Sequence, residues 1–182
     1  MSEIYVNQDI ALRNIKVEHA DEIYNLISRN RHALRKWLPF VDNTLRPNDT
    51  RRYILQVNED VEKSQEIVFE VWFKNQIAGL ISYRSIDYIN QKIEIGYWLS
   101  PQFEGKGIIT LSVRELIRHA FNDMNINRIY IRCGIENTKS SNIPKRLNFK
   151  FEGIERDGQL LNGKFIDLEV YSLLKVEWMI TS

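Results

Sequence analysis

The chain has 182 residues, of which 43% are hydrophobic and 27% are charged, and its formal net charge is +1 at pH 7. This length suits one domain with a substantial core, so we expect a single domain over residues 1–182. Acidic and basic residues are interspersed, whereas a nucleic-acid-binding protein usually has a basic face. No apolar run reaches the roughly 18 residues that cross a bilayer. The composition therefore argues against partners among nucleic acids and membranes.

The N-terminus and the cysteine usage indicate the compartment. The opening MSEIYVNQDI is mixed and acidic, unlike a secretory signal. Cys133 is the sole cysteine and cannot form an internal disulfide, so we expect a cytoplasmic protein. No histidine is near Cys133 in the sequence, which favours a buried structural role over a nucleophile. His19, His32 and His119 have no metal-ligand spacing, so no metal site is expected.

The first part of the chain is predicted to form a strand and three helices. The strand covers residues 10–15, and an amphipathic helix covers 18–28. A second helix fits 31–38 and ends before Pro39, because proline disfavours a helical conformation in the residue before it. A third helix begins near Asn48. The apolar face of the first helix carries Ala20, Ile23, Tyr24 and Ile27. That of the third carries Tyr53, Ile54, Val57 and Val61.

The middle of the chain changes to the alternating pattern of strands. Residues 67–73 and 76–85 are rich in β-branched and aromatic residues, with Lys74-Asn75 as a tight turn between them. A further strand covers 91–99. One face of that strand is predicted to carry Ile93, Ile95, Tyr97 and Leu99. The other face is predicted to carry Glu94, Gly96 and Trp98.

The last part alternates helices and strands. A helix is predicted over 107–124, a strand over 128–133 and a helix over 138–147. Late strands are predicted over 150–155 and 164–174. This order indicates an α/β protein with a mixed sheet and helices on both of its faces.

The most informative segment is the loop from Gln102 to Gly107, which joins a strand directly to a helix. The first amides of a helix lack intrahelical partners and lie at the positive end of its dipole. Gly105 and Gly107 have no Cβ, so the backbone can approach an anion closely. Thr110 stands where a dinucleotide-binding motif needs its third glycine, and the spacing is not that of a Walker loop. The alternative is an ordinary turn that contains glycines.

Several motifs carry a family resemblance. Gln102-x-x-Gly105-x-Gly107 resembles the Gln/Arg-x-x-Gly-x-Gly/Ala signature of the GNAT acetyltransferases. Ile95-Gly-Tyr-Trp-Leu and the following Gly105-Lys-Gly-Ile resemble the RimL/RimJ branch, which acetylates protein N-termini. Leu34-Arg-Lys-Trp-Leu-Pro-Phe and Asn137-x-x-Ser140 with Leu147-Asn148-Phe149 resemble further segments of that branch. The resemblance covers about Ile10 to Trp178 and implies the GNAT fold. Asn148 replaces a family glycine after a helix, at a left-handed position that Asn tolerates.

The resemblance implies that acetyl-CoA binds where two neighbouring strands part. These strands would end at Leu99 and Cys133. The first would offer backbone groups to the pantetheine arm, and the amides of 103–108 would hold the pyrophosphate. The residues expected to bind the cofactor are Trp98, Leu99, Ser100, Gln102, Phe103, Glu104, Gly105, Lys106, Gly107, Ile108, Asn137 and Ser140.

The resemblance also implies two candidate catalytic residues. Glu94 could take the proton of the amine, or it could be a solvent-facing strand carboxylate. Ser140 could hydrogen-bond the leaving thiolate, or it could hold the backbone at the start of a helix. The tyrosine that many GNAT enzymes use as an acid is replaced by Pro144, and a glutamate that can serve as base in the RimL branch is replaced by Gln159.

An enzyme without a strong catalytic base is better suited to an α-amine acceptor than to a lysine side chain. At pH 7 roughly 10% of protein α-amines are neutral, compared with well under ~0.1% of lysine side chains. The resemblance to the RimL/RimJ branch implies acetylation of a protein N-terminus, such as that of a ribosomal protein, by direct attack in a ternary complex, and the pKa of an α-amine suits this acceptor. Acetylation of a small-molecule amine, such as an antibiotic, an amino acid or a polyamine, is the alternative. A non-catalytic acyl-CoA sensor and a nucleotide-binding module are further readings. The resemblance is compatible with a homodimer. The wall of the acceptor pocket is predicted to include Trp37, Phe40, Tyr88 and Tyr97, unless these rings pack in the core.

Overall fold

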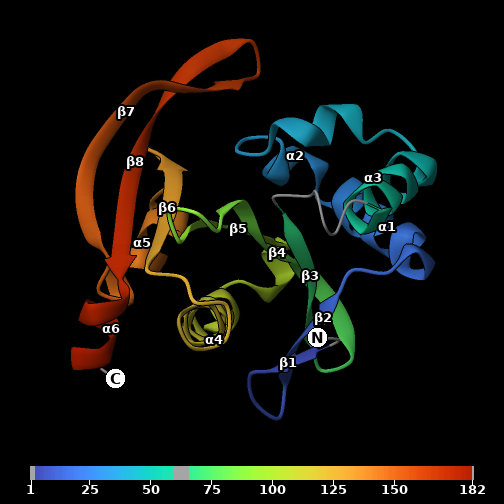
Figure 1. Ribbon diagram of the computed structural model, residues 1–182. Helices are drawn as coiled ribbons and strands as arrows, with labels where there is room; N and C mark the ends of the chain where they lie inside the picture. Colours follow the sequence, from blue (N-terminus) through green and yellow to red (C-terminus); the bar gives the residue numbers. More distant parts are fainter. Residues whose placement is uncertain (1–2, 60–65, 182) are drawn as a thin grey trace.

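The computed structural model describes residues 3–59 and 66–181. In this part of the chain eight strands form one mixed sheet in the order β1-β2-β3-β4-β5-β6-β8-β7 (Figure 1). The β5–β6 pair is parallel and the other neighbours are antiparallel. The strands are β1 (Glu3–Tyr5), β2 (Ile10–Asn14), β3 (Ile67–Phe73), β4 (Gln76–Asp87), β5 (Lys92–Leu99), β6 (Arg128–Gly134), β7 (Lys150–Leu161) and β8 (Lys164–Leu174).

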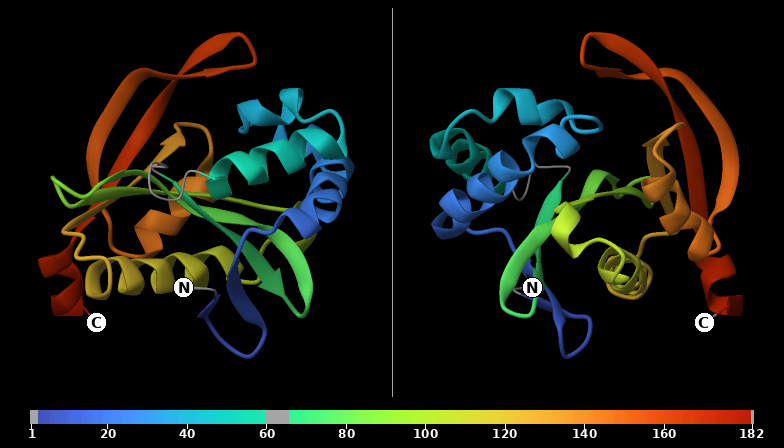
Figure 2. Two further views of the ribbon diagram at one scale, coloured as in Figure 1. Left: turned by 45° about the vertical axis from the view of Figure 1, so that its right-hand side comes forward. Right: turned by 180° about the vertical axis from the view of Figure 1, so that it is seen from behind.

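Helices cover both faces of this sheet, as the sequence predicts (Figure 2). One buried cluster packs α4 against the sheet, and the other packs α1 and α3 against it. Within the described ranges, no helix is long and apolar enough to cross a membrane. The α-helices are α1 (Ala20–Arg29), α2 (Arg31–Leu34), α3 (Pro47–Glu59), α4 (Ile108–Asn122), α5 (Thr138–Arg146) and α6 (Lys175–Thr181). The 3-10 helices are η1 (Val17–His19), η2 (Pro39–Asn43) and η3 (Pro101–Phe103).

Two predicted elements have the wrong length. The helix predicted over 31–38 ends at Leu34, and the chain continues through turns into η2. The Arg31 guanidinium donates to the carbonyls of Val41 and Thr44, which holds η2 back against α2 and prevents a longer helix. The strand predicted to end at residue 155 continues to residue 161, because the pairing with β8 resumes at Gln159 after a register shift.

Other predictions are confirmed by the backbone. Lys74 and Asn75 have positive φ and form the β3–β4 turn, and Asn148 has φ 59°. The two faces of β5 are divided as expected, since Ile95 packs in the α4 cluster and Trp98 in the α1–α3 cluster. Val61, predicted on the α3 face, lies outside the described residues.

Candidate active site

The last part of β5 has an open edge where it parts from β6. In the described residues, β5 pairs with β6 only over 92–94, while its pairing with β4 continues to Leu99. The Ser100 amide donates to the Ala78 carbonyl at 2.8 Å. Because hydrogen-bonded pairs alternate along an antiparallel ladder, the backbone of Trp98 also faces β4, and those of Tyr97 and Leu99 face the gap. The gap therefore presents unpaired strand groups from alternate residues.

This alternation of backbone groups between β4 and the gap corrects two of the backbone contacts expected from the sequence. Leu99 is placed to offer its backbone to a ligand in the gap. Trp98 uses its backbone on the β4 side. Ser100 is fully buried, its amide is bonded to Ala78, and its carbonyl accepts the Phe103 amide at 3.0 Å. Tyr97, expected only in the pocket wall, has a backbone that faces the gap.

The loop that follows β5 ends in a row of free amides. Gly105 and Gly107 have φ of 76° and 73°, and a Cβ at either position would meet nothing within 4 Å. No amide from Gly105 to Thr110 has a hydrogen-bond partner in the described part of the chain, and the first backbone bond there is Leu111 to Gly107. These donors point out of the positive end of α4, which is the arrangement that binds phosphate groups.

The side chains of the loop are held by the protein itself. Phe103 is buried and packs edge-on against Phe73, and the Lys106 ammonium lies over both rings. Gln102 is exposed and lines a shallow pocket of about 380 Å³ beside α1. Glu104 forms an ion pair with Lys139 of α5, across the gap. The loop would therefore bind an anion mainly through its backbone.

Ser140 meets Tyr97 on the inner side of the gap. The Tyr97 hydroxyl donates to the Ser140 carbonyl at 3.0 Å, and the Ser140 hydroxyl donates to the Tyr97 oxygen at 3.3 Å. The Asn137 side chain caps α5 by accepting from the Ser140 amide at 3.2 Å. Cys133 lies beside this group and is buried, and burial raises the pKa of its thiol to about 11. Such a thiol stays protonated at neutral pH, which agrees with a structural role.

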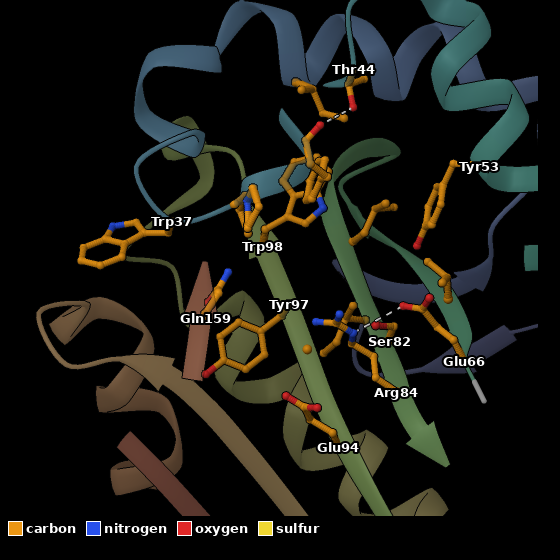
Figure 3. A pocket seen from close by; sticks show the side chains of 18 of the residues that line it. Trp37, Thr44, Tyr53, Glu66, Ser82, Arg84, Glu94, Tyr97, Trp98 and Gln159 are labelled. Atoms are coloured by element: carbon orange, nitrogen blue, oxygen red, sulfur yellow. Dashed lines mark hydrogen bonds and ion pairs between the residues drawn. The ribbon is translucent and has the colours of Figure 1, made fainter. Parts of the chain in front are cut away.

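A cavity of about 650 Å³ connects the gap to the space under α1 and α3. Figure 3 shows Trp37, Trp98, Gln159 and Tyr97 on one side of the cavity, and Tyr53, Glu66 and Arg84 on the other. Of the residues predicted from the sequence, the cavity brings together Trp37, Phe40, Glu94, Tyr97, Trp98, Asn137 and Ser140. Tyr88 is not brought to it, because it lies after β4 in the turn to β5 with 63% of its surface exposed.

Glu94 is neither solvent-facing nor free. It is 5% exposed, and both of its carboxylate oxygens accept hydrogen bonds from Arg132, at 2.9 and 3.1 Å. Arg132 also binds Glu155 of β7 at 3.2 Å, and these carboxylates raise the pKa of the guanidinium. Both oxygens of the Glu94 carboxylate are thus occupied by Arg132, and this pair holds β5 against β6 at the closed end of the gap.

The sequence reading missed several charged residues of the cavity. Arg132, Arg84 and Glu66 line it, and Arg84 pairs with Glu66 at 3.7 Å. Arg132 lies on the same face of β6 as Tyr130, which is opposite Glu94 in the parallel β5–β6 register, so its place could be found only from that register. Glu66 directly precedes β3, and its place beside Arg84 depends on the β3–β4 register, which pairs Ile67 with Tyr83.

Comparison with known proteins identifies the family. The model of the GNAT acetyltransferase domain matches residues 9–150. The chain is a GNAT N-acetyltransferase. YdaF of Bacillus subtilis (strain 168), provisionally named a ribosomal N-acetyltransferase, is 38% identical over 174 residues, which are 95% of each chain.

Two solved structures are similar throughout. One is RimL, a ribosomal alpha-N-protein acetyltransferase, in a complex where coenzyme A is joined by a disulfide to a cysteine of that protein. Its TM-score is 0.91, with 26% identity over 95% of this chain and 98% of that one. The microcin self-immunity acetyltransferase MccE, in complex with acetyl-CoA and AMP, has a TM-score of 0.90 and 32% identity over 94% of this chain and 95% of that one. This enzyme is therefore RimL-like and has the acetyl-CoA-binding GNAT fold.

The GNAT site fits a CoA thioester. The free amides of 105–110 suit a pyrophosphate, and the open β5 edge suits the amide groups of a pantetheine arm. Among the described residues, no group of three or more His, Cys, Asp or Glu side chains could hold a metal ion.

Proposed function

We propose that this enzyme acetylates the α-amine of a protein N-terminus, in the cytoplasm, by direct attack in a ternary complex with acetyl-CoA. The observation that carries the proposal is the state of the described carboxylates that line the cavity. Glu94 is held by Arg132, Glu66 pairs with Arg84, and Asp49 accepts the amides of Leu45 and Arg46 at 3.0 Å. None is free to serve as a strong base, which suits an amine that is already partly neutral at pH 7.

The residues of the chain divide the reaction between them. Bound acetyl-CoA supplies the acetyl group as a thioester. The amides of 105–110 would hold the pyrophosphate, and a backbone N–H of the open β5 edge would polarise the thioester carbonyl. Ser140, at the positive end of α5, would donate a hydrogen bond to the sulfur as the carbon–sulfur bond breaks. The electron pair stays on the sulfur, and the proton that the amine loses ends on the released thiol.

The relatives support a protein acceptor. RimL is described as an alpha-N-protein acetyltransferase, and YdaF carries a ribosomal name. The cavity of about 650 Å³ has room for the first residues of an extended peptide. Trp37 closes one end of it, where its ring packs over Gly134 at the end of β6.

The test compares two kinds of peptide with acetyl-CoA, followed as thiol release. One series begins with a free Ser or Ala, and the other has a blocked N-terminus and a free lysine. We expect release with the first series, with kcat/KM rising with pH up to about 8, where an α-amine loses its proton. Equal turnover of the blocked peptides would refute the α-amine assignment.

A second candidate is acetylation of an amine on a nucleotide-like small molecule. MccE binds AMP together with acetyl-CoA. In this chain Phe40 and Trp98 line the cavity with ring centroids 6.5 Å apart, and Trp37 lines it nearby, so flat groups could stack there. AMP should then compete with the acceptor at concentrations that leave acetyl-CoA binding unchanged. Absence of competition would remove this candidate.

We also propose that the enzyme forms a homodimer through the β7–β8 hairpin. β7 is an edge strand, and the hairpin exposes large apolar side chains to solvent. The exposed fractions are Phe151 56%, Ile154 47%, Leu160 55% and Phe165 64%. Phe165→Glu should convert a dimer to a monomer in sedimentation experiments, whereas a monomeric parent protein would refute the proposal.

A further inference from the structure

Pro144 leaves the Ser140 carbonyl without its usual helical partner. In an α-helix the amide of residue i donates to the carbonyl of residue i−4, so residue 144 would serve Ser140. Proline has no N–H, and its ring crowds the carbonyl four residues earlier. Pro144 lies inside α5, which spans only 9 residues. The Ser140 carbonyl is therefore available to a donor from outside the helix.

Tyr97 supplies that donor from the opposite side of the gap. Its hydroxyl donates to the Ser140 carbonyl at 3.0 Å and accepts the Ser140 hydroxyl at 3.3 Å. With the Asn137 cap on the Ser140 amide at 3.2 Å, all three polar groups of Ser140 have a fixed partner. Burial raises the pKa of Tyr97 above its ordinary value, so the phenol keeps its proton over the whole working range of pH.

We propose that Tyr97 is a positioning residue for acetyl transfer, which holds Ser140 at the leaving thiolate by replacing the helical hydrogen bond that Pro144 cannot make. The proposal rests on the proposed function for the role of Ser140. When the sulfur becomes negative, the Ser140 hydroxyl turns from the Tyr97 oxygen to the sulfur. The Tyr97 bond to the carbonyl stays in place and keeps the first turn of α5 against β5. Pro144 replaces the tyrosine that many GNAT enzymes use as an acid. In this chain it acts by lacking an amide, which leaves the Ser140 carbonyl free to accept from Tyr97.

A double-mutant cycle of Tyr97→Phe and Pro144→Ala tests this coupling. Tyr97→Phe keeps the ring and removes the hydroxyl. In the parent protein we expect kcat to fall about tenfold, with the Kd of coenzyme A changed by less than about twofold. Pro144→Ala restores an amide for the Ser140 carbonyl, so in that background Tyr97→Phe should lower kcat by no more than about threefold. Equal losses in both backgrounds would overturn the proposal, as would a loss of coenzyme A affinity as large as the loss of kcat.

The readouts separate this proposal from the function proposed above. Turnover is measured as thiol release with a Ser-initiated peptide and also as slow hydrolysis of acetyl-CoA, which expels the same thiolate whatever the natural acceptor is. If the peptide is not acetylated but hydrolysis shows the coupling, the α-amine assignment fails and the role of Tyr97 stands. Tyr24→Phe is the matched control, since Tyr24 also donates to a backbone carbonyl, that of Leu45 at 2.9 Å, away from the gap. It should leave kcat unchanged, and a tenfold loss there would show that the Tyr97 effect is not specific.

Discussion

The Asn162 side-chain amide donates a hydrogen bond to the Arg35 carbonyl at 3.1 Å, across 127 residues of sequence. This bond ties the tip of the β7–β8 hairpin to the end of α2, and Figure 1 shows the hairpin reaching towards that helix. Gln159 and Ile166, near the tip, line the cavity. This side-chain contact therefore helps to hold the outer wall of the cavity in which we propose that the acceptor binds.

Asn162→Gly should loosen that wall. Asn162 has φ 51°, and glycine accepts this conformation while removing the donor. We expect the KM of a peptide acceptor to rise about threefold to tenfold, with kcat and the Kd of acetyl-CoA unchanged. Steady-state kinetics with a Ser-initiated peptide would measure the change. Asn125→Gly is the control, because Asn125 has φ 54° in the turn before β6. An equal rise in KM in both variants would argue against the role of the contact.

Gly107→Trp should abolish cofactor binding. A side chain there has open space in the free protein, but it would occupy the approach to the amides at the start of α4. The positive φ of 73° adds a backbone cost of about 1 kcal/mol. Acetyl-CoA should raise the Tm of the parent protein and leave that of the variant unchanged.

Gly163→Trp is the control for this substitution. Gly163 has φ 78°, a Cβ added there would meet nothing within 4 Å, and the residue lies on the hairpin away from the loop. Its Tm should fall by a similar amount, while the shift with acetyl-CoA remains. Retention of the shift in Gly107→Trp would place the pyrophosphate elsewhere.

Glu94→Gln should destabilise the fold more than it slows the reaction. Removing one partner of a buried ion pair leaves Arg132 partly uncompensated, at a cost of roughly 1–3 kcal/mol in the free energy of unfolding. Urea denaturation would measure this loss. Glu155→Gln removes the more exposed partner of the same guanidinium and should cost about 0.5 kcal/mol. A large fall in kcat for Glu94→Gln at unchanged stability would instead identify Glu94 as the base.

Glu152 should give the fold an acid-sensitive component. Arg128 binds its carboxylate at 2.6 Å, and this hydrogen bond lowers the pKa of Glu152 to about 2. Because the folded pKa lies below the unfolded value near 4.3, the contribution to stability is complete above that value. It is lost as the pH falls towards 2. Denaturation midpoints between pH 6 and pH 2 should fall less steeply in Glu152→Gln, and an unchanged slope would contradict this assignment.

Local sequence patterns predicted the elements better than the contacts between them. The alternation on β5 correctly separated Ile95 from Trp98, and the paired glycines correctly marked the start of α4. These features depend on residues within one turn or one strand. The length of α2 depended instead on a long-range contact from Arg31 to the η2 carbonyls, which no local pattern contains.

The loop of the candidate site was predictable from the sequence, but the side of β5 to which each backbone group points was not. The loop amides follow from two glycines before a helix, but the pairing of Glu94 with Arg132 requires the register of β5 against β6. The same holds for Tyr97, whose hydroxyl reaches Ser140 of α5 only because the two strands part. Tyr88 was wrongly predicted to line the cavity. It is close to β5 in the sequence, but its side chain is exposed in the β4–β5 turn and does not line the cavity.

The short β5–β6 ladder has a thermodynamic consequence for the folded state. Backbone groups of β5 that have no partner in β6 can form hydrogen bonds with an extended ligand in the gap. Because only the folded state has this gap, such a ligand stabilises the folded state relative to the unfolded one. At a free concentration one hundred times its Kd, such a ligand adds about 2.7 kcal/mol to the free energy of unfolding. The lifetime of this enzyme against proteolysis should accordingly follow the supply of the thioester that it consumes.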